Sequence, residues 1–271
     1  LASHWAAVAP GKRLEYSNFG FVIIGTVMEA VTAERFDRLM KRLVLDPLEI
    51  RGCYNWSLCA PELAANAAAL YRTGPDETEW HPSGIWVAQI DDLKGTAPAC
   101  PVRRSDPTQP CDLANYHPGS NGALFSPQGG LRITISDLAV FARVLMNDGR
   151  FGGKPFLKRQ SVEAMLVPQW QYSSADVNGA TQNGSICAYG LSIHLIGHSS
   201  LSGCRDDLFG DGVARVGHLG EAYGLLGGIW IDRAAKRGAI YLVTGTSDDP
   251  HRERGRTGFT ILEEELAARL R

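Results

Sequence analysis

The stretch LEYSNFGFVIIG, residues 14–25, places a phenol, a hydroxyl and an amide directly before an apolar pattern of helical spacing. A helix start needs only one side chain as a cap, so Ser17 or Asn18 explains the start and leaves Tyr16 without a structural role. The triplet is therefore either a helix cap alone or one part of a catalytic site. The rest of the chain has to decide between these interpretations.

The composition excludes several classes of function. The 271 residues are 44% hydrophobic and 21% charged, as in ordinary globular proteins with one large or two medium domains. A net charge of -2 and a pI near 6.4 do not indicate the excess of basic residues that is typical of nucleic-acid-binding proteins. The longest apolar run, residues 19–31, contains Glu29 and is too short to span a bilayer. Because the sequence begins with Leu1, we expect it to start inside a longer precursor.

The cysteines form three local couples in the sequence. They are Cys53 with Cys59, Cys100 with Cys111, and Cys187 with Cys204. Six cysteines allow about fifteen pairings, and buried free thiols remain an alternative. The sequence contains no CxxC motif, so the spacing of the cysteines does not indicate a structural zinc site. Each couple lies in or beside an expected loop, where a disulfide can close without distorting a helix or strand, so we favour local disulfides and a periplasmic or secreted protein.

The hydrophobic period changes from helical to extended along the chain. Helices are expected at residues 18–30, 34–44, 61–70, 135–146, 159–166 and 257–271, and strands at 190–196, 213–216, 224–231 and 239–243. Thr134 followed by Asp137 resembles a capping box at the fourth helix. The order predicts an α+β fold in two domains: residues 1–175, mostly helical with long disulfide-stapled loops, and residues 176–271, an antiparallel sheet with a covering helix.

Histidines supply two further candidate sites. His218 lies between glycines in RVGHLGEAYGLLGGIWID, residues 215–232, at the expected end of a short strand. By itself it could be only a turn histidine of a hairpin. His194 and His198 are four residues apart and could share a metal ion on a helix, but their surroundings predict a strand. We therefore predict no metal site, and hydrolysis by a metal bound to this pair would require loss of activity with a chelator.

Three elements in one order carry a resemblance to a known family. They are Tyr16-Ser17-Asn18, the segment GALFSPQGGLRITISDLAVFARVLMNDGRF (residues 122–151) and His218-Leu219-Gly220. The chain resembles the penicillin-recognising serine hydrolases: class C β-lactamases, D-amino-acid-specific peptidases and family VIII carboxylesterases. The first triplet matches their Tyr-x-Asn element and the last their Lys/His-Thr-Gly element. The resemblance covers nearly the whole chain and implies a β-lactamase/transpeptidase-like fold.

The resemblance also implies roles for residues. Acyl transfer through a serine ester would use Tyr16 as base or proton shuttle, Asn18 to hold a lysine or a substrate carbonyl, and His218 across the cleft as a source of positive character. A phenol with a pKa near 10 needs such neighbouring positive charge to act as a base. Gly220 would let substrate lie against its strand, and the N–H of Glu221 would be an oxyanion donor. Neither a metal nor an organic cofactor is implied.

Two departures from the family pattern shape the expected function. The family nucleophile is the serine of Ser-x-x-Lys, and no serine here has a lysine three residues later. We expect that serine, with the N-terminal part of the fold, on an upstream segment or separate chain; the alternative is a non-catalytic ligand-binding or sensor protein. Leu219 replaces a frequent threonine that helps hold a carboxylate.

This replacement favours a peptidase or amidohydrolase over a β-lactamase, with a family VIII-type esterase as a further alternative. The expected partners are a small-molecule or peptide substrate and the completing segment. Nucleic acid and a membrane span are not expected.

Overall fold

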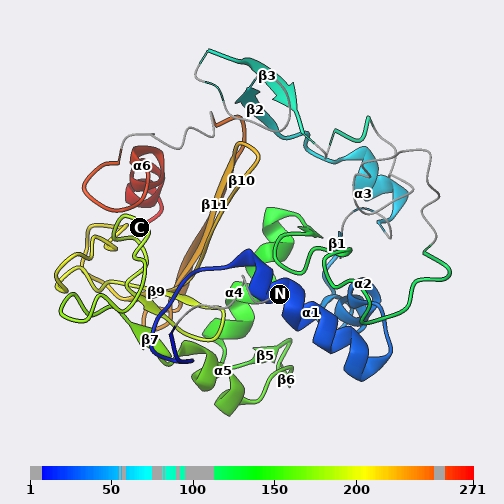
Figure 1. Ribbon diagram of the computed structural model, residues 1–271, viewed down its shortest axis with the longest axis horizontal. Helices are drawn as coiled ribbons and strands as arrows, with labels where there is room; N and C mark the ends of the chain where they lie inside the picture. Colours follow the sequence, from blue (N-terminus) through cyan, green and yellow to red (C-terminus); the bar gives the residue numbers. More distant parts are fainter. Residues whose placement is uncertain are drawn as a thin grey trace.

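The structure is a computed structural model that describes residues 8–54, 56, 59–74, 81, 83–89, 92–94, 113–246 and 254–271. Its helices are α1 (Asn18–Thr32), α2 (Phe36–Met40) with a π-helical turn at Lys41–Leu45, α3 (Pro61–Ala65), α4 (Ile135–Met146), α5 (Arg159–Leu166) and α6 (Ile261–Arg269). Figure 1 shows them around a sheet whose long strands are β10 and β11. The predicted α+β fold is confirmed.

The main sheet has six strands in the order β12-β11-β10-β9-β8-β7, and every described pairing is antiparallel. They are β7 (Trp170–Gln171), β8 (Ala188–Tyr189), β9 (His194–Ile196), β10 (Arg215–Ala222), β11 (Leu225–Asp232) and β12 (Arg237–Val243). Small pairs complete the strands: β1 (Cys53–Tyr54) with β4 (Leu131–Arg132), β2 (Tyr71–Gly74) with β3 (Ile85–Ala88), and β5 (Arg150–Phe151) with β6 (Lys154–Pro155).

Several boundaries differ from the sequence expectations. The strand expected at 213–216 runs on to Ala222, so His218 lies inside β10 and not at a strand end. The tight turn at Tyr223 and Gly224, with φ of 54° and 75°, lets β10 pair with β11 along its length. Between the expected helices at 61–70 and 135–146, where no strand is expected, the structure contains the antiparallel pair β2–β3. The division of the chain at residue 175 stays a prediction, and β7 already belongs to the sheet.

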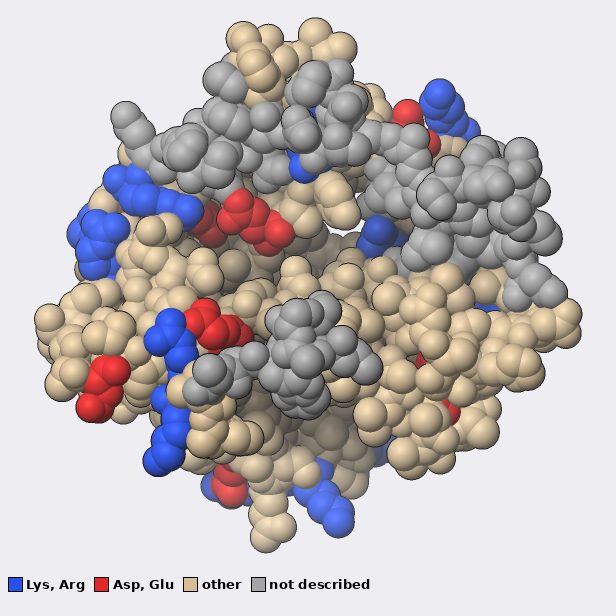
Figure 2. All heavy atoms as spheres, in the orientation of Figure 1, with Lys and Arg blue, Asp and Glu red and all other residues tan. Residues whose placement is uncertain are grey.

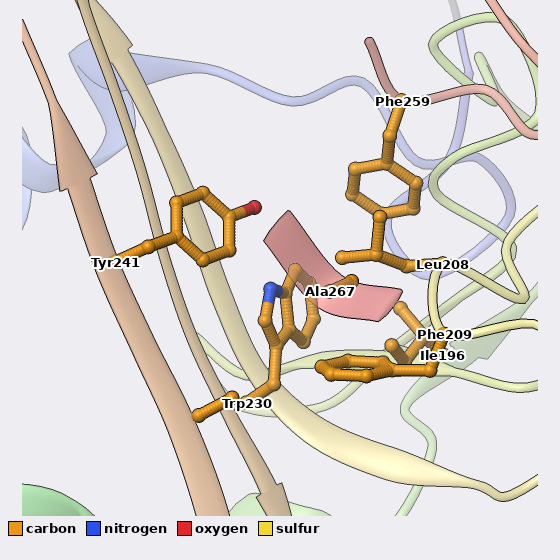
Figure 3. Packing of buried hydrophobic residues seen from close by; sticks show 8 residues of the cluster. Ile196, Leu208, Phe209, Trp230, Tyr241, Phe259 and Ala267 are labelled. Atoms are coloured by element: carbon orange, nitrogen blue, oxygen red, sulfur yellow. The ribbon is translucent and has the colours of Figure 1, made fainter. Parts of the chain in front are cut away.

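Hydrophobic clusters hold helices against both faces of the sheet. Ile196 of β9 packs into a hydrophobic cluster with Trp230 of β11 and with Ala267 of α6. Figure 3 shows these side chains close together. The neighbouring Leu195 packs with Leu145 of α4 on the other side. Adjacent residues of a strand point to opposite faces, so α6 and α4 cover opposite faces.

The helix α1 buries a glycine and a glutamate and exposes most of its large apolar side chains. Its buried residues are Gly25, against Pro127, and Glu29, which accepts hydrogen bonds from Phe36 N at 2.8 Å and from Gly119 N at 2.9 Å. Its exposed face is apolar. The exposed apolar side chains, called the α1 stripe here, are Phe19, Ile23, Ile24, Val27 and Val31, each at least 51% exposed. A surface helix of a soluble protein normally has the reverse distribution.

Both signs of charge are present on the face of the molecule shown in Figure 2. In the face shown in Figure 2, acidic and basic side chains are interspersed among many uncharged residues. None of the described helices combines the length and the hydropathy needed to cross a bilayer.

Candidate active site

Three aromatic rings from distant parts of the chain meet beside the main sheet. Tyr16 precedes α1, Tyr189 ends β8, and His218 lies in β10. The ring centroids of Tyr16 and His218 are 6.0 Å apart, those of Tyr189 and His218 6.0 Å, and those of Tyr16 and Tyr189 6.4 Å. The first and last motifs of the sequence are thus neighbours in space.

A backbone contact positions the segment that carries Tyr16. Leu14 N donates to Asn178 O at 3.1 Å, and Ala180 N donates to Leu14 O at 3.1 Å, which forms a parallel bridge between Leu14 and Gly179. A Cβ on Gly179 would lie 2.7 Å from the Trp170 ring and 2.8 Å from Leu14 O. Only glycine allows this approach, because real Cβ atoms essentially never come so close.

The side chain of His218 is hydrogen-bonded at both ring nitrogens. Nδ1 lies 2.5 Å from the carbonyl oxygen of Leu219, and Nε2 lies 2.7 Å from the hydroxyl oxygen of Tyr189. A carbonyl can only accept, so Nδ1 carries the proton. In the neutral imidazole Nε2 is then the acceptor, and Tyr189 donates to it. Burial lowers the pKa of His218, which keeps the ring neutral near neutral pH.

The two phenols of the cluster are held in their protonated form. Burial raises the pKa of Tyr16 above its ordinary value. Burial also raises the pKa of Tyr189, and a negative charge on Tyr16 would raise it further. The neutral His218 does not supply the positive character expected of it. Lowering the pKa of Tyr16 therefore requires a cation from outside this cluster.

The other predicted site residues lie near this cluster along the chain, with different degrees of exposure. Asn18 is the exposed first residue of α1, directly after Ser17, which occupies the N-cap position without a side-chain cap hydrogen bond. Glu221 is exposed near the end of β10. A Cβ added at Gly220 would meet nothing within 4 Å, so the space beside this residue is open. Leu219 instead packs against the hydrophobic cluster that contains Trp230.

The strand β10 has an open edge next to His218. Its pairing with β9 covers only residues 215–217, whereas its pairing with β11 covers residues 216–222. Among the described residues, therefore, β10 has no strand on the β9 side from His218 onward. An extended substrate could add to this edge through main-chain hydrogen bonds.

The histidines considered as a metal pair have separate local partners. His194 is fully buried, and its Nε2 donates to Ser185 O at 2.8 Å. Burial lowers the pKa of His194 to about 3, so the ring is neutral. The Nδ1 atom of His198 lies 3.3 Å from an oxygen of Asp206. Among the described residues, no group of three or more His, Cys, Asp or Glu side chains is placed to hold a metal ion.

Two of the expected cysteine couples are joined in the structure. Disulfides link Cys53 to Cys59 and Cys187 to Cys204. The couple Cys100 and Cys111 lies outside the described residues. Cys187 directly precedes β8, so its disulfide anchors the strand that ends in Tyr189.

Sequence reasoning missed Tyr189. Its only local signals are its place in a short strand and the Gly190 that follows. Its proximity to His218 arises from the pairing of β8 with β9 and of β9 with β10, which no local pattern reveals.

Comparisons with known proteins concern the family and the fold of the chain. The Beta-lactamase family model matches residues 1–259. A D-stereospecific amidohydrolase from Streptomyces sp. has 17% sequence identity and a TM-score of 0.55, with 89% of this chain and 53% of that chain covered. The D-amino acid amidase from Ochrobactrum anthropi SV3, complexed with D-phenylalanine, has 17% identity and a TM-score of 0.54, with 90% and 55% covered.

An octameric penicillin-binding protein homologue from Pyrococcus abyssi is also similar, with 18% identity, a TM-score of 0.56, and 91% of this chain and 42% of that chain covered. The chain thus spans about half the length of these solved structures. At such identities the likeness shows the fold alone. No curated protein matches the chain.

Proposed function

We propose that this chain, which belongs to the β-lactamase family, acts in a serine hydrolase that cleaves an amide or peptide bond through an acyl-enzyme. The observation that carries the proposal is the cluster of Tyr16, Tyr189 and His218 beside the open edge of β10. The family match supports hydrolase activity in general. The cluster suggests which residues handle protons.

The proposed chemical steps are those of acyl transfer through a serine that the completing segment would supply. The serine oxygen bonds to the substrate carbonyl carbon, its proton is transferred to a base, and the carbon–nitrogen bond breaks as the leaving amine receives a proton. Water then adds to the acyl carbon, the bond to the serine oxygen breaks as that oxygen regains a proton from the water, and the acid is released. Tyr16, protonated at rest, suits delivery of a proton to the leaving group, and it can act as a base only beside an added cation. The N–H of Glu221 is the proposed oxyanion donor.

The nucleophile is proposed to come from a segment that carries Ser-x-x-Lys, whose lysine supplies the missing cation. Uncovered surfaces of the described structure support such a segment. The α1 stripe begins one turn after Tyr16 and remains exposed. The strand β12 pairs with β11 on one side and, among the described residues, with no strand on the other. A long unpaired edge is a surface that proteins normally cover.

Amide or peptide substrates are favoured over β-lactams and esters. Two structural relatives are named as a D-stereospecific amidohydrolase and a D-amino acid amidase. Amides of D-amino acids are therefore the first substrates to assay. The disulfides support a periplasmic or secreted location.

A covalent probe tests the proposal. The chain is purified together with the segment that carries Ser-x-x-Lys, treated with a fluorophosphonate, and its intact mass is measured. We expect one adduct on the serine of that segment. Absence of an adduct, together with no hydrolysis of D-amino acid amides, would instead support a non-catalytic binding or sensor protein.

A further inference from the structure

We propose that Tyr189 is the positioning residue of His218 and that, by occupying Nε2, it excludes substrates with a free carboxylate at this place in the site. The structural half of the proposal concerns the imidazole alone. The substrate half rests on the proposed function, because only a hydrolase would present substrate to His218.

The position of Tyr189 is fixed by strands on both sides. Its backbone pairs with Trp170 of β7 and with His194 of β9. Gln169 N also donates to Tyr189 O at 2.8 Å. From this fixed backbone the phenol reaches His218, with 2.7 Å between the hydroxyl oxygen and Nε2. The imidazole orientation is therefore set by the sheet.

The hydrogen bonds of His218 leave no donor for a substrate. A neutral imidazole has one N–H donor and one acceptor nitrogen. The donor Nδ1–H is directed at Leu219 O, and the acceptor Nε2 receives the hydroxyl of Tyr189. A carboxylate needs a donor, so binding one here would require a proton on Nε2 and rotation of the phenol hydrogen.

The surroundings of His218 favour this neutral state. Among the described residues, the phenols of Tyr16 and Tyr189 contact its ring, and the buried imidazole of His194 interacts with it electrostatically. Both phenols stay protonated and His194 stays neutral, so these groups provide no negative charge to stabilise an imidazolium. An uncharged amide or ester group, which needs no cation, is compatible with this arrangement.

Nitrogen-15 NMR of the histidine side chains tests the structural half on the 271-residue chain. His218→Gln assigns the resonances. We expect the proton on Nδ1 and a hydrogen-bonded, unprotonated Nε2 near neutral pH. Tyr189→Phe should move the Nε2 resonance toward that of a free ring nitrogen and leave Nδ1–H in place. Tyr172→Phe, which removes a nearby phenol outside the cluster, should change neither.

Binding of a simple carboxylate tests the substrate half. Acetyl-D-alanine is titrated into both proteins at about pH 5.5, below the ordinary imidazole pKa. The Tyr189→Phe chain should bind it about tenfold more tightly than the unmodified chain, as one charge-assisted hydrogen bond would allow.

Three results would overturn the proposal: a proton on Nε2 in the unmodified chain, an unchanged Nε2 resonance in Tyr189→Phe, or equal affinities of the two proteins for acetyl-D-alanine. Neither measurement needs turnover. The proposal can therefore fail while the serine hydrolase proposal stands, and the structural half can stand if the serine hydrolase proposal fails.

Discussion

Ser17 and Tyr16 show how a short motif divides between structure and chemistry. Ser17 takes the N-cap position of α1, yet its side chain makes no cap hydrogen bond, so capping does not explain the triplet. Tyr16 is 39% exposed and turns its ring toward His218. The motif is therefore available for a site.

Replacement of Tyr16 by phenylalanine should affect chemistry and leave folding nearly unchanged. In the protein completed by its nucleophile segment, we expect kcat for a D-amino acid amide to fall about 100-fold or more, the usual size of lost acid–base catalysis. The melting temperature should stay close to that of the unmodified protein, because the ring packing is retained. Tyr71→Phe, at another exposed tyrosine, is the control. A kcat within a factor of about two of normal would remove Tyr16 from the mechanism.

The buried imidazole of His194 should make the free energy of unfolding decrease as the pH falls below 6.5. Its folded pKa, about 3, is below the ordinary 6.5, so the unfolded chain binds the extra proton first. Stability from this group is complete above pH 6.5 and is lost as the pH falls toward 3, by about 1.4 kcal/mol per pH unit. Urea unfolding at several pH values should show that His194→Phe weakens this slope. Parallel curves for the two proteins would contradict the assignment.

Helix ends show which parts of the fold could be predicted from sequence. The side chain of Thr134 accepts from Asp137 N at 3.1 Å, as the local pattern predicted. Helical stripes depend on residues close in sequence, so α4, which has this cap, and α5, which has no side-chain cap, were both predicted well. The length of β10 was not, because a strand rich in glycine has a weak pattern and is extended by pairing with β11. Tyr189, the hydrogen-bond partner of His218, was missed because it reaches His218 through the pairing of strands that are distant in sequence.

Replacing the N-cap residues of α6 and α1 by alanine should change the free energy of unfolding by different amounts. Thr260 forms a capping box with Glu263 at the start of α6, and both reciprocal hydrogen bonds are present. Thr260→Ala should therefore lower the free energy of unfolding by about 1 kcal/mol. Ser17→Ala should change it by only a few tenths, since Ser17 makes no cap bond. Chemical denaturation of the two variants measures the contrast, and equal losses would refute it.

At the scale of the whole molecule, the α1 stripe is an exposed apolar surface on the described part of the chain. A row of exposed apolar side chains on a helix whose buried face holds Glu29 is expected to bind another apolar surface. The stripe also continues from the motif that carries Tyr16. Its placement agrees with the proposal that the nucleophile segment covers it.

Charging the stripe should therefore suppress association. The isolated 271-residue chain should self-associate with rising concentration, and the double variant Ile23→Lys, Val27→Lys should remain monomeric in sedimentation experiments. Val167→Lys, at a 54% exposed position outside the stripe, is the control and should behave like the unmodified chain. Identical sedimentation of all three would show that the stripe is not adhesive.

Because Cys187 and Cys204 form a disulfide, the activity of a preparation should depend on whether the production host allows that bond to form. In a reducing cytosol the thiols would stay apart, and closing a loop of this length is worth about 3 kcal/mol. The strand bearing Tyr189 would then lose its tether, and a preparation could be inert for reasons unrelated to its catalytic groups. Export into an oxidising compartment, or refolding with a glutathione couple, avoids that false negative.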